Sequence, residues 1–272
     1  EYHEQAAWVA YVVNGDRLRG TIPRTDNFRP DLEISSGSSS LADYRRSGFD
    51  RGHLAPAALM KWSRTAMSES FLMSNMSPQR PAFNRGIWKK LEALVRTWGS
   101  KEERLHVVTG PVLTEGLATI GPNHVSVPDY FFKVILDYQA PVYKAIGFVL
   151  PNRASKAPIR QFSMAVDDVE ELTGHDFYPE LEDALENQLE ATADFRAWPA
   201  GEPASRRGKV PPERRSIRAE MEAAATVVYV TPSGKKYHTA TCRYVKKTKQ
   251  AIGRRRARED GYDPCKVCKP GW

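Results

Sequence analysis

The apolar residues of the chain follow two spacings, one typical of strands and one typical of helices. Short runs rich in Val, Ile, Tyr and Phe, separated by Gly and Pro, predict the strands of a sheet. These runs cover residues 7–13, 105–113, 124–138 and 143–151.

Two other segments have the spacing or the charge pattern of a helix. Within residues 83–99, one apolar stripe stops at Gly99 and consists of Ile87, Leu91, Leu94, Val95 and Trp98. The segment 177–192 predicts a second helix, because its acidic first turn suits the positive end of a helix dipole. Strands and helices that do not alternate as βαβ units predict an α+β fold, with a mostly antiparallel central sheet flanked by helices.

The composition changes near Trp198 and divides the chain into a large domain and a small module. Residues 198–224 are rich in Pro, Gly and charge, which predicts a linker between a domain at 1–197 and a module at 225–272. In the module, residues 225–238 predict a short strand pair with Pro-Ser-Gly as its turn.

Charge is distributed unevenly along the 272 residues. From Arg206 to Trp272 there are 18 Lys and Arg against 6 Asp and Glu, whereas residues 1–205 hold 22 against 27. A cationic tail beside a mildly acidic body suggests a tether for a polyanion such as nucleic acid, although a solvated basic tail has the same composition. No run of about 18 apolar residues exists, so we expect no membrane-spanning helix.

The stretch Asp-Arg-Gly-His at residues 50–53 combines residue types that suit phosphoryl chemistry. His53 has an ordinary pKa near 7 and can accept a proton from water. Arg51 offers a planar charged fork to a phosphate, Gly52 permits close approach, and Asp50 can orient a neighbouring group. Each residue alone is also common in a purely structural role, so these four positions make a hypothesis rather than an assignment.

The helix predicted at 83–99 carries a second polar row, formed by Asn84, Glu92 and Arg96 together with Trp88. These positions recur every four residues, so an amide, a carboxylate and a guanidinium line one edge of the helix beside the apolar stripe. The alternative is a surface ion pair between Glu92 and Arg96, worth roughly 0.3–0.5 kcal/mol.

Taken together, these motifs resemble those of the DNA/RNA non-specific endonucleases, which use a ββα-metal (His-Me finger) site. The resemblance covers roughly residues 7–190 and has several motifs in the same order. They are RTDNFRPD near the N-terminus, GFDRGHLAPA at 48–57, MSNMSPQ at 73–79, FNRGIWKKLE at 83–92, VPDYFFKVIL at 127–136 and ELTGHDFYPEL at 171–181.

The resemblance implies a role for each matching residue. His53 would be the general base, Asn84 the direct ligand of a catalytic magnesium (or manganese) ion, and Glu92 a holder of metal-bound water. Arg51 and Arg96 would contact the scissile or an adjacent phosphate. The supporting polar residues would be Arg24, Asp50 and Asn75, with Asp50 orienting the site rather than reacting.

The implied reaction is hydrolysis of a phosphodiester bond to 5′-phosphate and 3′-hydroxyl ends. Magnesium keeps several waters and accepts few protein ligands, so a single amide oxygen is a plausible anchor for it. Contacts to phosphate carry no sequence information, and a 2′-hydroxyl is not required, so DNA and RNA are both expected substrates.

All three cysteines lie in the predicted C-terminal module. His238 and Cys242 are four residues apart, and Cys265 and Cys268 form a Cys-x-x-Cys pair, so together they offer the four ligands of a closed structural zinc site. The run YHTATCRYVKK followed by PCKVC resembles small Ada-like metal-binding units. A redox Cys-x-x-Cys, or free cysteines with an incidental His238, are the alternatives.

The basic stretch 246–260 between the ligand pairs is expected to be a helix or loop, and either tracks a nucleic-acid backbone or only aids solubility.

Two other functions fit parts of this sequence. The first is a catalytically silent nucleic-acid-binding protein that uses the basic zinc tail, and the presence of His53, Asn84 and Glu92 together argues against it. The second is a phosphodiesterase for small substrates, which would not need an extended cationic surface. The resemblance implies a secreted or periplasmic location, and it leaves an inhibitor protein and a homodimer open.

Overall fold

The computed structural model describes residues 3–35, 37–114, 116–199, 227–231, 234–239, 242–245, 250–253, 257 and 261–268. The chain divides into two compact units, residues 1–214 and 215–272, which we describe separately. All but two residues of the predicted linker at 198–224 lie outside the described residues, so its bounds stay a prediction.

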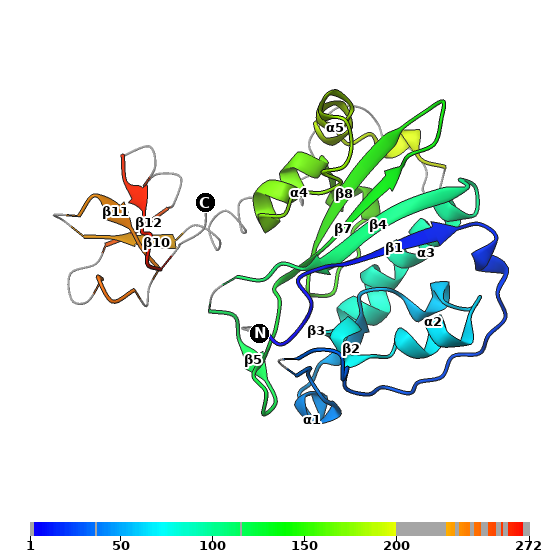
Figure 1. The fold of residues 1–272 in the computed structure, drawn as a ribbon, viewed down its shortest axis with the longest axis horizontal. Coiled ribbons are helices and arrows are strands. Elements are labelled where there is room, and N and C mark those ends of the chain that lie inside the picture. Colours follow the sequence, from blue (N-terminus) through cyan, green and yellow to red (C-terminus); the bar gives the residue numbers. More distant parts are fainter. Residues whose placement is uncertain are drawn as a thin grey trace. The chain divides into compact units, whose positions relative to one another are not determined.

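The first unit is organised around a five-stranded sheet with the order β1-β4-β7-β8-β9 (Figure 1). Each neighbouring pair is antiparallel, which confirms the predicted sheet. Its strands are β1 (Val9–Asn14), β4 (Arg104–Pro111), β7 (Tyr130–Asp137), β8 (Lys144–Pro151) and β9 (Ser163–Met164).

Both faces of this sheet are covered, because every residue of β7 is buried. On one face Phe131 stacks on Phe83, with ring centroids 5.4 Å apart. The next residue, Phe132, points to the other face and packs against Phe177 at 5.5 Å. The central strand therefore separates the segment that contains Phe83 from the segment that contains Phe177.

The face that bears Phe131 supports the polar motifs of the sequence. It is covered by η4 (Phe83–Trp88), a π-helical turn, and by α3 (Lys89–Gly99), as the stripe of apolar residues predicts. A two-stranded hairpin lies beside them and is formed by β2 (Asp50–His53) and β3 (Met76–Gln79). Two strands followed by a helix make the ββα arrangement that the resemblance implies.

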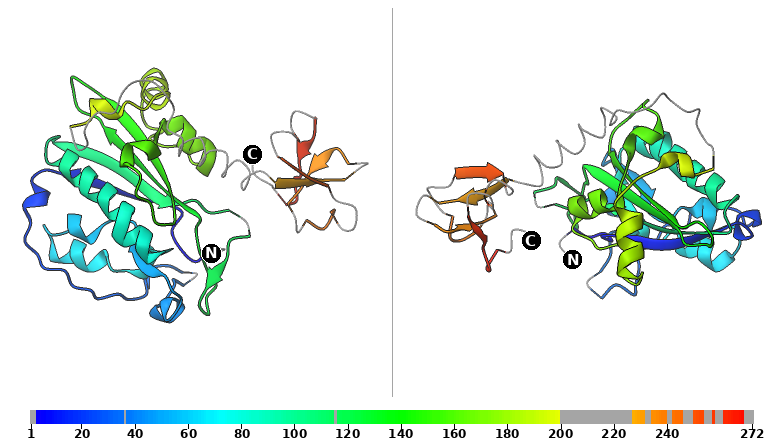
Figure 2. Two further views of the ribbon diagram at one scale, coloured as in Figure 1. Left: turned by 180° about the vertical axis from the view of Figure 1, so that it is seen from behind. Right: turned by 90° about the horizontal axis from the view of Figure 1, so that it is seen from above.

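The opposite face of the sheet is covered by α4 (Val166–Thr173) and α5 (Asp183–Glu190), which Figure 1 shows beside β8 and Figure 2 shows from two further directions. Helix α5 is shorter than the predicted helix at 177–192, because the chain turns at Tyr178, whose φ is 59°. Helix α4 was not predicted. Its eight residues include only two that are buried, Val166 and Val169, which is too short a stripe to recognise.

The remaining elements of the first unit are short and connect these layers. They are η1 (Arg17–Arg19), α1 (Leu41–Tyr44), η2 (Ala57–Leu59), α2 (Arg64–Glu69), η3 (Met73–Asn75), β5 (Thr119–Ile120), β6 (Val125–Ser126), η5 (Ile159–Phe162) and η6 (Phe195–Ala197). In the part of the chain that the structure describes, no helix has the length and apolar character needed to cross a membrane.

The second unit contains two pairs of short strands. Strand β10 (Val227–Val230) pairs antiparallel with β12 (Gln250–Gly253), and β11 (Lys236–Tyr237) pairs parallel with β13 (Asp263–Pro264). In the described part of the strand pair predicted at 225–238, an antiparallel bridge joins the two halves at Tyr229 and His238.

One expectation for this unit was wrong. The stretch 246–260 was expected to be a helix or loop, yet β12 lies within it and completes the ladder of β10. The distant pairing supplies hydrogen bonds that a local charge pattern cannot reveal. Most other residues of that stretch lie outside the described ones.

Candidate active site and metal centre

The hairpin of β2 and β3 places the Asp-Arg-Gly-His motif at the edge of the first unit. Arg51 pairs with Pro78 and His53 pairs with Met76. Side chains alternate along a strand, so Arg51 and His53 share one face of the hairpin while Asp50 lies on the other. A side chain at Gly52 would collide with the side chain of Gln79, which is why a glycine stands between the two.

Two phenylalanine rings form a floor beneath His53. Its imidazole lies edge-on to Phe71 and Phe28, at centroid distances of 4.9 and 5.8 Å. The guanidinium of Arg51 lies 4.3 Å from the centre of the Phe28 ring, and that of Arg24 lies 4.7 Å from the centre of Phe71. The floor therefore brings Arg24, which is remote in sequence, next to the imidazole of His53 and the guanidinium of Arg51.

This environment keeps the imidazole of His53 neutral. Burial lowers the pKa of His53 to about 3, and the charges of Arg24 and Arg51 act in the same direction. The Nε2 atom of His53 and the Nε atom of Arg51 are buried and have no hydrogen-bond partner within the described residues. A neutral imidazole with an uncommitted nitrogen can accept a proton.

Asp50 orients the residue that is expected to hold the metal ion. Its Oδ2 accepts a hydrogen bond from Nδ2 of Asn84 at 3.0 Å, while Arg85 donates to both carboxylate oxygens at 2.6 and 2.8 Å. The amide nitrogen of Asn84 is thus occupied, and among the described residues its Oδ1 accepts no hydrogen bond. The carbonyl oxygen of Asn84 is therefore the atom available to a hard cation such as Mg²⁺.

A break in the helix separates Asn84 from the rest of its row. Gly86 has φ −102° and ψ −110°, which is not helical, and α3 begins three residues later. The sequence predicted one continuous helix through this region, so Asn84 lies on a turn that precedes α3 rather than on α3 itself. The hydrogen bond to Asp50 then fixes this turn against the hairpin.

Glu92 lies on α3 and is half-buried. Burial raises its pKa to about 7, although the positive charges of Lys133, Arg96 and Arg24 oppose this shift. No ion pair forms between Glu92 and Arg96 in the structure as described, so the surface-pair alternative does not hold. The carboxylate can be protonated or ionised near neutral pH.

Sequence reasoning missed Lys133, which is fully buried on β7. Its Nζ donates a hydrogen bond to the hydroxyl of Tyr11 at 3.0 Å and lies 4.8 Å from the centre of the Trp88 ring. Burial lowers the pKa of Lys133 to about 8, and the nearby Glu92 opposes the shift. A lysine in the apolar run YFFKVIL was the available signal, because a buried charge requires a partner.

The three remaining polar residues differ in their surroundings. All described hydrogen bonds of the Asn75 side chain go to the backbone of Ala55 and Ser70, so this residue holds the chain just after His53. Its amide is buried and both of its N–H donors bind backbone, which favours a positioning role. Arg24 pairs with Asp26 at 2.6 Å and its side chain is 50% exposed, whereas Arg96 acts on the site through its charge near Glu92.

Comparison with known proteins supports the family that the motifs suggest. The model of the family described as DNA/RNA non-specific endonuclease matches residues 1–184. The chain belongs to this family.

Relatives within this endonuclease family include human mitochondrial endonuclease G, which is 36% identical over 191 residues. That match covers 65% of this chain and 64% of the human protein, so it spans less than two thirds of the relative. Nuclease C1 of Cunninghamella echinulata var. echinulata is 37% identical over 194 residues, covering 65% of this chain and 77% of that protein.

A solved structure also resembles this endonuclease-family chain. It is the crystal structure of the EndoG/EndoGI complex, which matches with a TM-score of 0.62 and 31% identity over 66% of this chain and 81% of that one. The α+β fold with its antiparallel sheet is thereby confirmed. The roles of individual residues stay predictions.

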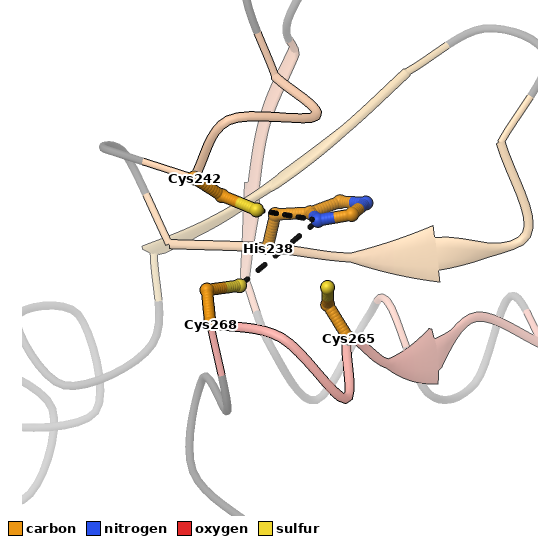
Figure 3. A group of neighbouring side chains, drawn as sticks. All are labelled: His238, Cys242, Cys265 and Cys268. Atoms are coloured by element: carbon orange, nitrogen blue, oxygen red, sulfur yellow. Dashed lines mark hydrogen bonds between the residues drawn. The ribbon is translucent and has the colours of Figure 1, made fainter.

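The family match ends before the second unit, where the four predicted zinc ligands come together. Figure 3 shows His238, Cys242, Cys265 and Cys268 converging, and their ligand atoms all lie within 4.8 Å of one another. The Nδ1 atom of His238 lies 3.2 Å from Sγ of Cys242 and 4.0 Å from Sγ of Cys268. The three cysteines are free, so none is committed to a disulfide.

The surroundings of these four residues fit a tetrahedral zinc site. The backbone N–H of Thr239 donates to Sγ of Cys268 at 3.4 Å, a bond that stabilises a thiolate. His238, Cys242 and Cys265 are buried, and among the described residues no carboxylate offers a fifth ligand. Three thiolates and one imidazole without an open position suit structural rather than catalytic zinc.

Proposed function

We propose that this chain is a metal-dependent endonuclease that hydrolyses the phosphodiester bonds of DNA and RNA, leaving 5′-phosphate and 3′-hydroxyl ends. The observation that carries this proposal is the neutral imidazole of His53, whose Nε2 atom is buried and uncommitted, beside the equally uncommitted Nε of Arg51. Family membership and the free Oδ1 of Asn84 support it.

In this proposal His53 takes a proton from the attacking water as the water oxygen bonds to phosphorus and the bond to the 3′ oxygen breaks. Arg51 binds a phosphate oxygen, and Arg96 contacts the same or an adjacent phosphate. Asn84 would hold a magnesium or manganese ion through Oδ1, and Glu92 would orient water beside it. When bound, the ion stabilises the negative charge that develops on the phosphate and the leaving oxygen.

We propose DNA and RNA as substrates because the groups assembled at this site recognise phosphate. Two guanidinium groups and a cation read neither the base nor the 2′-hydroxyl. The acidic body and the basic C-terminal tail suggest that the tail concentrates nucleic acid near the site. We also propose zinc as a structural cofactor of the second unit, on the grounds of its four converging ligands.

The experiment that tests the function compares wild type with His53→Ala on plasmid DNA, single-stranded DNA and RNA. Magnesium is added to or withheld from dialysed protein rather than removed with EDTA, because EDTA would also extract zinc. The control is His124→Ala, since His124 is an exposed histidine outside the site. We expect all three polymers to be cut only with metal, by wild type and by the control.

An alternative outcome would favour the silent binding protein. If His53→Ala cuts as fast as wild type, His53 is not the base. If no protein cuts under any divalent metal while the polymers shift in a gel, the chain binds nucleic acid without turnover. The first result would overturn the role of His53 alone, whereas the second would contradict the proposed endonuclease.

Location and partners follow from the same proposal. A nuclease without sequence preference endangers the genome of its own cell, so we propose a secreted or periplasmic location, which fractionation of the native host would test. The related EndoG was solved with EndoGI in a study of its inhibition, so an inhibitor protein is a partner class for this chain.

A further inference from the structure

Three carboxylates converge on the face of the sheet opposite to the hairpin. Asp167 and Glu170 are three residues apart on α4 and therefore share one side of that helix, and Glu190 is the last residue of α5. One oxygen atom from each lies within 4.8 Å of the other two. The group connects α4 and α5, two helices of eight residues each.

A cluster of acidic residues has no meaning by itself, but Glu190 is not an ordinary surface residue. It is only 4% exposed, and its Oε1 is buried without a hydrogen-bond partner among the described residues. No described Lys, Arg or His forms an ion pair with Asp167, Glu170 or Glu190. Burying a carboxylate among other carboxylates without a counter-charge is costly.

The second member of the group is held in place. Oε1 of Glu170 accepts a hydrogen bond from the backbone N–H of Phe177 at 2.7 Å, so this oxygen is occupied and the other one is available to a ligand. Asp167 is exposed and supplies the side of the group that faces solvent. An ion could therefore enter from water and reach the buried Glu190.

We propose that Asp167, Glu170 and Glu190 bind one calcium ion that joins α4 to α5. Three carboxylate oxygens are hard ligands, and waters on the side of Asp167 can complete the shell. Ca²⁺ takes about six to eight oxygen ligands in flexible geometry, whereas Mg²⁺ demands a near-octahedral shell and is seldom held by protein carboxylates alone, so a group of three carboxylates suits calcium.

This site is separate from the proposed active site. Phe132 packs against Phe177, in the segment that follows α4. It points away from the face of the sheet that carries α3 and the hairpin. The inference therefore does not depend on nuclease activity and can succeed or fail independently of it. The competing explanation is that Glu190 takes up a proton instead, because burial raises its pKa to about 8.

The test uses the full chain with Asn84→Ala, which removes the direct ligand proposed for the catalytic metal, and with zinc held constant. Calcium is titrated into metal-free protein by calorimetry, and thermal unfolding is recorded with and without calcium. Glu190→Gln and Asp167→Asn are then added singly to this background. The matched control is Glu182→Gln, which removes an exposed carboxylate at the start of α5.

We expect one calcium per chain in the background protein and in the Glu182→Gln control. At hundredfold excess over its dissociation constant, calcium should raise their unfolding midpoints by roughly 3 °C or more. Glu190→Gln and Asp167→Asn should abolish both effects. Absence of calcium binding in the background protein, or binding that survives Glu190→Gln, would overturn the proposal and leave Glu190 as a buried neutral acid.

Discussion

At the scale of single residues, the surroundings of a side chain decide what it can do chemically. His53 is an unremarkable titratable group in the sequence, and the rings of Phe28 and Phe71 turn it into a neutral, desolvated imidazole. Asp50 similarly turns Asn84 from a donor and acceptor into an oriented acceptor. Neither effect depends on an unusual residue, because both arise from neighbours placed by the fold.

The depressed pKa of His53 predicts how the metal-free protein responds to acid. The folded state has a pKa near 3 and the unfolded state one near 6.5, so the unfolded state binds more protons below pH 6.5. The contribution of His53 to stability is complete above pH 6.5 and is lost as the pH falls toward 3. Between pH 7.5 and pH 5.0 this loss amounts to roughly 2 kcal/mol.

The measurement is denaturant unfolding of wild type and His53→Gln at both pH values, followed by tryptophan fluorescence. The variant should lose less free energy of unfolding on acidification than wild type. His124→Gln is the control, because an exposed histidine should leave the difference unchanged. Equal losses in wild type and His53→Gln would show that His53 is not buried as described.

Lys133 is predicted to act on the reaction through Glu92. Its charge opposes the burial that raises the pKa of Glu92 to about 7, so Lys133→Met should raise this pKa further. A rise of one unit lowers the ionised fraction of Glu92 at pH 7 from about one half to about one tenth, roughly fivefold. We therefore expect a lower kcat at pH 7 that recovers toward pH 9.

The pH dependence of kcat is the measurement that separates this role from a structural one. Tyr11→Phe is the control, since it removes the hydroxyl that Lys133 contacts and keeps both charges. A variant whose activity is low at every pH would indicate damage to packing instead. A pH profile identical to that of wild type would exclude coupling between Lys133 and Glu92.

At the scale of elements, local patterns predicted the long strands β1, β4, β7 and β8 and the helix α3, but neither the short strand β9 nor the break before α3. The stripe from Ile87 to Trp98 is a property of adjacent turns and is visible in the sequence. The break at Gly86 was not visible, because glycine is compatible with several conformations and the hydrogen bond from Asn84 to Asp50 selects one of them. Helix α4 escaped prediction because packing on β8, not its own apolar stripe, stabilises it.

The second unit is predicted to depend on zinc. Its buried hydrophobic clusters are small, and one of them includes Cys242 and Cys265. Such clusters bury too little apolar surface to stabilise a module of this size without a metal ion. Cys265→Ser should remove the one zinc ion per chain and unfold this unit, while the unfolding midpoint of the first unit stays unchanged. Elemental analysis and calorimetry measure the two effects.

Val267→Ala is the matched control, because Val267 lies between Cys265 and Cys268 and is 52% exposed. It should retain zinc. If Cys265→Ser also retains zinc, or if wild type contains none and its Cys-x-x-Cys pair is readily oxidised, the structural zinc site is wrong and the redox alternative gains support.

At the scale of the whole molecule, the division of charge between body and tail is the property with functional consequences. The tail from Arg206 to Trp272 has 18 basic and 6 acidic residues, whereas the body carries a net negative charge. Long polyanions should therefore be attracted mainly by the tail, and the attraction should weaken with salt.

Neutralising part of the tail should change binding and leave chemistry intact. Arg254→Gln with Arg255→Gln should raise KM for long DNA at low salt, leave kcat unchanged, and reduce the slope of log KM against log salt by up to about 2. The control is Lys101→Gln with Arg104→Gln, two exposed cations of the body. Equal effects of the two double variants would show that the tail has no special role.

The sequence by itself determined the family, the antiparallel sheet and the helix after the hairpin, and it supplied the prediction of which groups react. These depend on residue type, spacing and order, which are properties of the chain alone. Only the tertiary structure decided that His53 is neutral, that Asn75 holds backbone, that Lys133 lies close enough to Glu92 to shift its pKa, and that three carboxylates converge between α4 and α5. Burial and contact between distant segments set pKa values and free ligand atoms, and no local pattern encodes them.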